Sequence, residues 1–161
     1  MNIRQGQSDD VSAIGQVAER SWESDYPDIL HRENVEDIVN DWYDEQQIRE
    51  ELQNDDTLIV VAEDDGEVVG FAHGVWSRRT GHILRVYVDP DNRGEGLGSE
   101  LLAAVRDSLI KRGSDRIQAM VLAENEAGNQ FYRDAGFEKI DDAETTIGEE
   151  TYTENVYAKT M

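Results

Sequence analysis

The spacing of apolar residues predicts two helical stretches near the start of the chain. After a short strand over 3–4, apolar residues recur three and four positions apart over 11–22, as they do on one face of a helix. The polar triplet at 8–10 offers an N-cap for this helix. A second stripe of the same period predicts a helix over 32–52, either continuous or broken near Asp44.

At Thr57 the pattern changes to that of strands. A run of β-branched and aliphatic residues at 58–62 predicts a buried strand, and the acidic, glycine-containing segment 64–67 predicts a hairpin turn. The return strand is expected over 68–76, and a third strand over 81–88.

The second half of the chain alternates helices with strands. A glycine-rich segment from Arg93 to Gly98 leads into an amphipathic helix that Gly113 ends. We then expect a strand, a short helix and two strands of antiparallel character, over 117–122, 125–135, 137–140 and 152–158. Since no repeat or linker interrupts this order, residues 1–161 are predicted to form a single α/β domain.

The charge of the chain limits the classes of partner that we expect it to bind. Acidic residues number 36 against 15 basic ones, which gives a net charge of −21, and only three of the basic residues are lysines. Such a field repels phosphate backbones, so we expect no nucleic-acid and no membrane partner. The acidic surface is interpreted first as a halophilic adaptation, because concentrated salt screens self-repulsion to a range of about 3 Å at 1 M. Steering of a cationic substrate is a second, compatible interpretation.

Cysteine and histidine usage excludes several chemistries. The chain contains no cysteine, which rules out a disulfide framework and a thiolate nucleophile. Its three histidines are scattered, so no metal site is expected. The N-terminus has no apolar leader, and the longest apolar run, 58–62, is far too short to span a membrane. We therefore expect a cytoplasmic location.

The segment with the clearest chemical meaning is Arg93-Gly94-Glu95-Gly96-Leu97-Gly98. It is predicted to join the end of a strand to the start of a helix, where backbone N–H groups and the positive end of the helix dipole converge. Glycines let the backbone approach a ligand closely, and Arg93 adds a guanidinium group suited to phosphate oxygens. The segment is therefore a candidate pyrophosphate site.

Two common nucleotide loops do not fit this segment. A Walker loop requires Lys and then Ser or Thr after its last glycine, whereas Gly98 is followed by Ser99-Glu100. A dinucleotide fingerprint requires G-x-G-x-x-G at the start of the first βαβ unit, whereas this loop reads G-x-G-x-G and follows three strands.

The loop instead resembles the R-x-x-G-x-G pyrophosphate loop of the GNAT superfamily, the acyl-CoA-dependent N-acetyltransferases. Asn125, Phe131-Tyr132 and Gly136-Phe137 resemble the helix segment that follows in that superfamily, and the order of elements is similar over the whole chain. The resemblance implies a GNAT-like domain with a largely antiparallel sheet of about seven strands and about four helices. The sheet would be splayed around the CoA-binding loop.

The resemblance also implies roles for individual residues. The backbone of Val86, Tyr87 and Val88 would pair with the pantetheine arm of acetyl-CoA as an added strand does. Asn125 would hydrogen-bond that arm or the adjacent backbone, and Tyr132 would lie near the thioester sulfur and act as the general acid. The pyrophosphate would be held by Arg93, Gly94, Gly96, Leu97, Gly98 and Ser99.

The reaction that these roles imply is direct attack of a primary amine on the thioester. A lysine-like amine is neutral at pH 7 only about once in 10³–10⁴ molecules, so a base or a water chain has to remove its proton. The third strand carries no carboxylate over 81–87, and His82, Glu23 and Asp25 remain candidates for the base. The sequence chooses none of them.

The acceptor also stays open. Small amines, polyamines, aminoglycosides and protein amines are all compatible with the sequence, and the family implies a possible homodimer. Trp22, Tyr26, Trp42 and Tyr43 are predicted to pack in the core or to shape an acceptor pocket. Two other functions compete with the transferase: a non-catalytic acyl-CoA-binding or sensory module, and a structural protein whose glycines only cap a helix.

Overall fold

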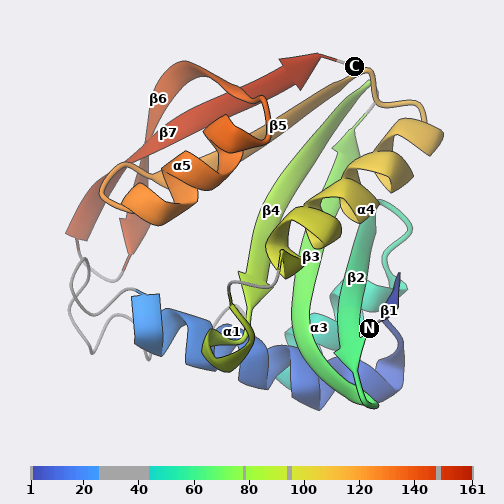
Figure 1. Ribbon diagram of the computed structural model, residues 1–161. Helices are drawn as coiled ribbons and strands as arrows, with labels where there is room; N and C mark the ends of the chain where they lie inside the picture. Colours follow the sequence, from blue (N-terminus) through green and yellow to red (C-terminus); the bar gives the residue numbers. More distant parts are fainter. Residues whose placement is uncertain (1, 26–43, 78, 94–95, 148–149, 161) are drawn as a thin grey trace.

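The computed structural model describes residues 2–25, 44–77, 79–93, 96–147 and 150–160. These residues form one seven-stranded sheet with strand order β1-β2-β3-β4-β5-β7-β6 (Figure 1). Every neighbouring pair is antiparallel except β4 and β5, which are parallel. The strands are β1 Asn2–Gln5, β2 Thr57–Asp64, β3 Glu67–Ser77, β4 Thr80–Val88, β5 Arg116–Leu122, β6 Glu138–Ile147 and β7 Glu150–Thr160.

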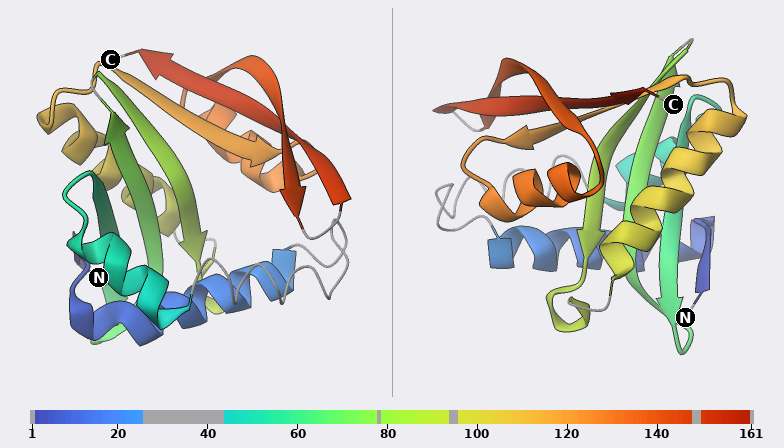
Figure 2. Two further views of the ribbon diagram at one scale, coloured as in Figure 1. Left: turned by 180° about the vertical axis from the view of Figure 1, so that it is seen from behind. Right: turned by 45° about the horizontal axis from the view of Figure 1, so that its top comes forward.

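Four α-helices occur in the described part of the chain, two on each face of the sheet. They are α1 Val11–Asp25, α3 Glu45–Gln53, α4 Leu97–Lys111 and α5 Glu126–Asp134. Figure 1 shows α4 in front of the β2–β4 region, and the left view of Figure 2 shows α1 and α3 on the opposite side. Two short 3₁₀-helices, η1 Ser8–Asp10 and η2 Pro90–Asn92, precede α1 and α4.

The predicted α/β fold with a splayed, largely antiparallel sheet is confirmed. The triplet at 8–10 forms η1 and leads directly into α1. The Asp44 side chain accepts a hydrogen bond from the Gln47 backbone N–H at 2.8 Å and caps α3 there. The remainder of the predicted 32–52 helix, together with Tyr26, Trp42 and Tyr43, lies outside the described residues.

One strand was predicted much too short. β6 runs from Glu138 to Ile147, whereas the apolar pattern predicted 137–140. Most of its side chains are exposed, and it pairs only with β7, at the edge of the sheet. Because the strand forms through backbone pairing with its neighbour, it needs no apolar alternation of its own.

The alternation along the strands builds two cores. We call the side covered by α1 and α3 the α1 face, where Ile14, Phe71 and Tyr87 are buried. The other side, covered by α4 and α5, is the α4 face, where Leu101, Val105 and Tyr157 are buried. Burial of large apolar side chains on both sides supplies most of the driving force for folding.

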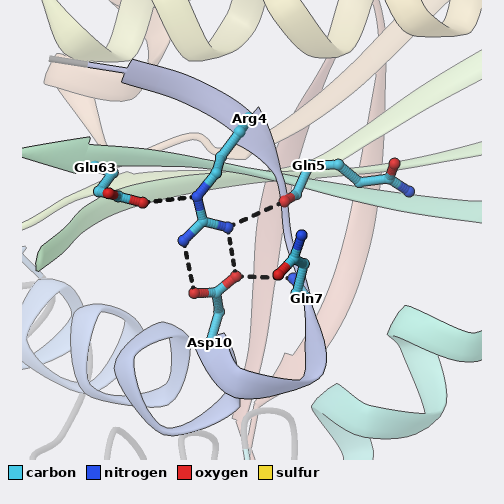
Figure 3. Close-up of polar contacts among 5 residues, drawn as sticks. All are labelled: Arg4, Gln5, Gln7, Asp10 and Glu63. Atoms are coloured by element: carbon cyan, nitrogen blue, oxygen red, sulfur yellow. Dashed lines mark hydrogen bonds and ion pairs between the residues drawn. The ribbon is translucent and has the colours of Figure 1, made fainter. Parts of the chain in front are cut away.

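A polar cluster fixes the first strand to the rest of the domain (Figure 3). The Arg4 guanidinium donates two hydrogen bonds to the Asp10 carboxylate, at 2.7 and 2.9 Å, and one to Glu63 at 2.7 Å. Asp10 also accepts a hydrogen bond from the Gln7 backbone N–H. These bonds to Arg4 lower the pKa of the Asp10 carboxyl, because they favour its charged form.

Candidate active site

The parallel pair β4–β5 forms a fork in the sheet. Its ladder runs from Thr80 opposite Arg116 to Ile83 opposite Ala119 and then ends, although both strands continue. Figure 1 shows the two strands side by side at one end and diverging toward the other. A cavity of about 810 Å³ fills the opening between them. It is lined by residues of both strands, of the segment before α4, of α4 and α5, and by Thr145 and Glu154 from β6 and β7.

A bulge shapes the β4 side of this cavity. On β3, His73 lies opposite Arg85 and the next residue, Gly74, lies opposite Ile83, so Leu84 is an extra residue in β4. The bulge changes the direction of the strand where the β4–β5 ladder ends. The following residues, Val86 to Val88, line the cavity and turn alternate side chains into the two cores. A strand edge of this kind can receive an extended ligand.

The N-terminus of α4 opens onto the same cavity. Gly96 is the N-cap residue, has a φ of 79° and makes no side-chain capping bond. The backbone N–H groups of the first helical turn are therefore left for solvent or a ligand. Leu97, Gly98 and Ser99, which the sequence analysis assigned to the pyrophosphate site, all line the cavity. Gly94 lies outside the described residues.

Arg93 and the segment before it are held by hydrogen bonds. Arg93 lines the cavity, and its Nε donates a hydrogen bond to the Val88 carbonyl at 3.2 Å. From α1, Arg20 donates hydrogen bonds to Asp89 at 2.6 Å and to Asp91 at 2.7 Å. Helix α1 is thereby tied to the segment that leads into α4.

Gly98 provides space for a neighbouring helix. A Cβ atom at this position would lie 3.2 Å from Cε1 of Phe131, closer than ordinary van der Waals contact. Phe131 belongs to α5 and also lines the cavity. The glycine thus allows α5 to approach the first turn of α4 across the opening, a packing role that adds to the predicted contact with a ligand.

Helix α5 brings both of its predicted site residues to the cavity. Asn125 is the N-cap, and its Oδ1 accepts a hydrogen bond from the Gly128 backbone N–H at 3.0 Å. Tyr132 is buried and lines the cavity. Its ring contacts Phe131 and Phe137 edge-on and stacks on Tyr157, with centroids 5.2, 5.4 and 6.0 Å away. Tyr132 therefore packs in the core and also lines the cavity.

Of the three candidates for the base, only His82 has a described side chain. His82 lines the cavity, where it lies opposite Gln118 at the paired end of the fork. Glu23 and Asp25 belong to α1, as does Trp22, but their side chains are not among those described.

Sequence reasoning missed Glu154 and Arg85. Both line the cavity, from β7 and β4 respectively. Burial raises the pKa of the Glu154 carboxyl, and the positive charge of Arg85 opposes that rise. The sequence signal that could have found Glu154 was its position in a predicted strand, midway between Tyr152 and Val156. Only the sheet order, with β7 next to β5, places it at the cavity.

The part of the chain that the structure describes offers neither a metal-binding group nor a membrane-spanning helix. No three His, Asp or Glu side chains there lie close enough together to hold a metal ion. None of its helices combines the length and apolar character needed to cross a membrane.

Comparison with known proteins assigns the chain to a family. The model described as the Acetyltransferase (GNAT) family matches residues 16–137, more than half of the chain. The chain belongs to the GNAT acetyltransferase family. An acetyltransferase of Pectobacterium atrosepticum is 31% identical over 142 residues, which cover 88% of this chain and 90% of the relative.

Solved structures agree with this assignment at the level of the fold. PaiA N-acetyltransferase from Thermoplasma acidophilum, in complex with coenzyme A, has a TM-score of 0.88 at 24% identity. The alignment covers 99% of this chain and 98% of that one. Ribosomal-protein-alanine N-acetyltransferase from Brucella melitensis has a TM-score of 0.79 at 24% identity, with both chains fully covered.

This GNAT protein is thus an acetyl-CoA-dependent N-acetyltransferase. This assignment favours the transferase prediction over the non-catalytic module and over the structural protein.

Proposed function

We propose that this enzyme transfers the acetyl group of acetyl-CoA to a primary amine by direct attack of the amine on the thioester within the β4–β5 fork. The observation that carries the proposal is the single cavity that joins the N-terminus of α4, the β4 edge and Tyr132. An anion site, a strand edge and a phenol are the three features that a thioester carried on a pyrophosphate-containing arm would use.

The donor is proposed to lie along β4. Its pyrophosphate is held by backbone N–H groups of the α4 N-terminus, at Leu97, Gly98 and Ser99, which follow the N-cap residue Gly96. Arg93 supplies a positive charge at the same point. This placement is supported by the missing side-chain cap at Gly96, which leaves backbone N–H groups available in the first turn of α4, where Leu97, Gly98 and Ser99 line the cavity. The pantetheine arm pairs with the backbone of Val86 to Val88, and the amide of Asn125 faces it from α5.

Tyr132 is proposed as the general acid. When the C–N bond forms and the C–S bond breaks, the departing thiolate requires a proton, which a phenol can donate. Its ring is held between Phe131, Phe137 and Tyr157, so the hydroxyl keeps a fixed direction. Such positioning of an acid typically contributes about 10²–10⁴-fold to the rate.

The acceptor is proposed to be a cationic amine. The net charge of −21 attracts ammonium groups toward the enzyme and disfavours anionic acceptors. Among proteins of similar fold are a ribosomal-protein-alanine N-acetyltransferase and an aminoglycoside 6'-acetyltransferase. An alanine-terminated peptide, kanamycin and spermidine are therefore the first amines to test.

The decisive experiment replaces Tyr132 by Phe. Thiol release from acetyl-CoA is measured with the three amines, and CoA binding by titration calorimetry. We expect turnover to fall about 10²-fold or more, with the Kd for CoA unchanged. Tyr152→Phe is the matched control, since the Tyr152 hydroxyl bonds Glu150 at the protein surface and not the cavity. Undiminished turnover in Tyr132→Phe would remove the phenol from the mechanism, and absence of CoA binding in the wild type would overturn the proposal as a whole.

A further inference from the structure

We propose that Glu154 is the general base that removes a proton from the acceptor ammonium group. This inference rests on the proposed transfer to an amine and names the residue that the sequence did not supply. Among the described residues that line the cavity, Glu154 is the only carboxylate. The other titratable or charged side chains lining it are His82, Arg85, Tyr87, Arg93 and Tyr132.

The position of Glu154 in β7 sets the side from which it reaches the cavity. Its neighbour Asn155 turns to the α4 face, where its Nδ2 donates a hydrogen bond to Oδ1 of Asn129 on α5 at 2.8 Å. Successive side chains of a strand point to opposite faces, so Glu154 lies on the α1 face. Tyr152, two residues before it, packs against the core of that face.

Acid and base therefore approach the fork from opposite sides of the sheet. Tyr132 reaches the cavity from α5, on the α4 face, and Glu154 reaches it from the α1 face. A thioester lying in the fork would present its carbonyl carbon to both. An amine entering on the α1 face meets Glu154 first, whereas the sulfur leaves toward Tyr132.

The surroundings of Glu154 suit proton transfer. It lies opposite Leu122 on β5 and Ala143 on β6, both of which are apolar, and Thr145 on β6 also lines the cavity. Burial raises the pKa of this carboxyl and so makes it a stronger base than a solvated one. Arg85, from β4, acts in the opposite direction and favours the ionised form that a base requires.

The proton balance of the step closes with these two residues. Glu154 takes one proton from R–NH₃⁺, and the neutral amine attacks the carbonyl carbon. The C–S bond breaks, and Tyr132 protonates the thiolate. The nitrogen, still carrying an extra proton, returns one to the phenolate. One proton in total leaves through Glu154 to solvent, which matches R–NH₃⁺ and acetyl-CoA giving R–NH–acetyl, CoA and H⁺.

The test compares the pH profiles of wild type and Glu154→Gln, with spermidine, kanamycin and an alanine-terminated peptide as acceptors. Near pH 7 we expect kcat/KM to fall about 10²–10⁴-fold in the variant. The variant depends on amine that is already neutral, so its kcat/KM rises about tenfold per pH unit up to the amine pKa. The wild-type value stays flat over that range, because Glu154 deprotonates the ammonium form. A purely structural role would lower activity equally at every pH.

Two controls accompany this comparison. Glu144→Gln removes the same charge from an exposed position on the neighbouring strand, and we expect wild-type kinetics from it. Arg85→Gln removes the positive charge beside Glu154, so the acid limb of the wild-type profile should move to higher pH.

The outcomes separate this inference from the proposed function. If the wild type transfers acetyl groups and Glu154→Gln retains the flat profile, Glu154 is not the base and the transferase proposal stands. If the variant raises only KM, Glu154 binds the ammonium group without taking its proton, and the inference is wrong. If the wild type binds CoA but releases thiol with none of the amines, the proposed acceptors fail and the inference fails with them. The inference is also wrong if a His82→Gln variant shows the rising pH profile that we expect of Glu154→Gln, because His82 would then be the base.

Discussion

The hydroxyl of Tyr157 donates a 2.7 Å hydrogen bond to Oδ1 of Asn129 inside the α4 face. The same oxygen accepts a bond from Asn155, and the Asn129 amide donates to the carbonyls of Leu122 and Asn125 at 3.0 and 2.7 Å. One buried side chain thus joins α5 to both β5 and β7. Because Tyr157 also stacks on Tyr132, this network fixes the orientation of a proposed catalytic group.

Replacing Asn129 by Ala should destabilise the protein more than a single hydrogen bond would account for. The variant leaves several buried polar groups unsatisfied, each of which costs about 1–3 kcal/mol, and we expect a total loss of about 2–4 kcal/mol. Urea denaturation measures it. Tyr157→Phe is the matched comparison, because it removes one donor only and should cost about 0.5–1.5 kcal/mol. Equal losses in the two variants would contradict a shared network centred on Asn129.

Replacing Gly98 by Ala should weaken CoA binding without unfolding the protein. The added methyl group lies 3.2 Å from Phe131, so α4 and α5 have to move apart where the pyrophosphate is proposed to bind. Within a helix, Ala is favoured over Gly by about 1 kcal/mol, which offsets part of the cost to stability. Titration calorimetry with CoA measures the change in Kd.

A second substitution tests the cause of that change. In Gly98→Ala combined with Phe131→Leu, the two ring atoms nearest to the added methyl group are gone. We expect this double variant to recover part of the lost affinity. If it binds CoA no better than Gly98→Ala alone, crowding against Phe131 is not the reason for the loss.

Stability should fall on the acid side of neutrality because of His73. Burial, together with the charge of Arg85, lowers the pKa of this imidazole to about 4, from an unfolded value of 6.5. Between these two pH values the unfolded chain binds more protons than the folded one, so the free energy of unfolding decreases as pH falls. The Glu51 carboxylate, 3.5 Å from Nε2, favours the charged ring but does not outweigh burial.

We expect the titration of His73 to lower the free energy of unfolding by about 2–3 kcal/mol. The full loss is reached near pH 4, and there is no loss near pH 7. Urea denaturation at several pH values between these limits measures it, with His73→Gln as reference. The variant cannot titrate there, so its stability should fall less steeply than that of the wild type. Parallel curves for the two proteins would show that His73 has the same pKa in the folded and unfolded states.

Salt should stabilise the protein. At a net charge of −21, self-repulsion in the compact state is large, and the screening length falls from about 10 Å at 0.1 M to about 3 Å at 1 M. We expect the thermal midpoint to rise with KCl over this range. A variant in which the acidic pairs Asp55-Asp56 and Asp141-Asp142 are changed to Asn should need less salt to reach the same midpoint. If variant and wild type respond to KCl alike, the excess of acidic residues does not serve salt adaptation.

Most of the fold could be predicted from the sequence because the spacing of apolar residues follows which side chains are buried. The strands buried in the centre of the sheet, such as β2 and β3, were predicted within two residues of their ends. β6 was not, since its exposed residues follow no apolar pattern and its length is set by pairing with β7.

The candidate site was predictable only where its residues are close together in sequence. The segment from Arg93 to Ser99 and the helix with Asn125 and Tyr132 each carry a local pattern, and the described residues of both line one cavity. Glu154 and Arg85 carry none. Their meeting depends on β7 lying beside β5 and on the divergence of β4, which are properties of strand order and not of spacing.

The divergence of β4 from β5 has one more consequence. The proposed donor site exists because two main chains separate, so large side chains do not have to form it. Side chains that line it from β6, such as Thr145, can therefore be exchanged while the backbone around the proposed thioester position is kept. A scaffold of this kind can keep one donor while its acceptor specificity changes. Engineering for new acceptors should therefore begin at Thr145 and at the neighbours of Glu154, and should leave the backbone of β4 intact.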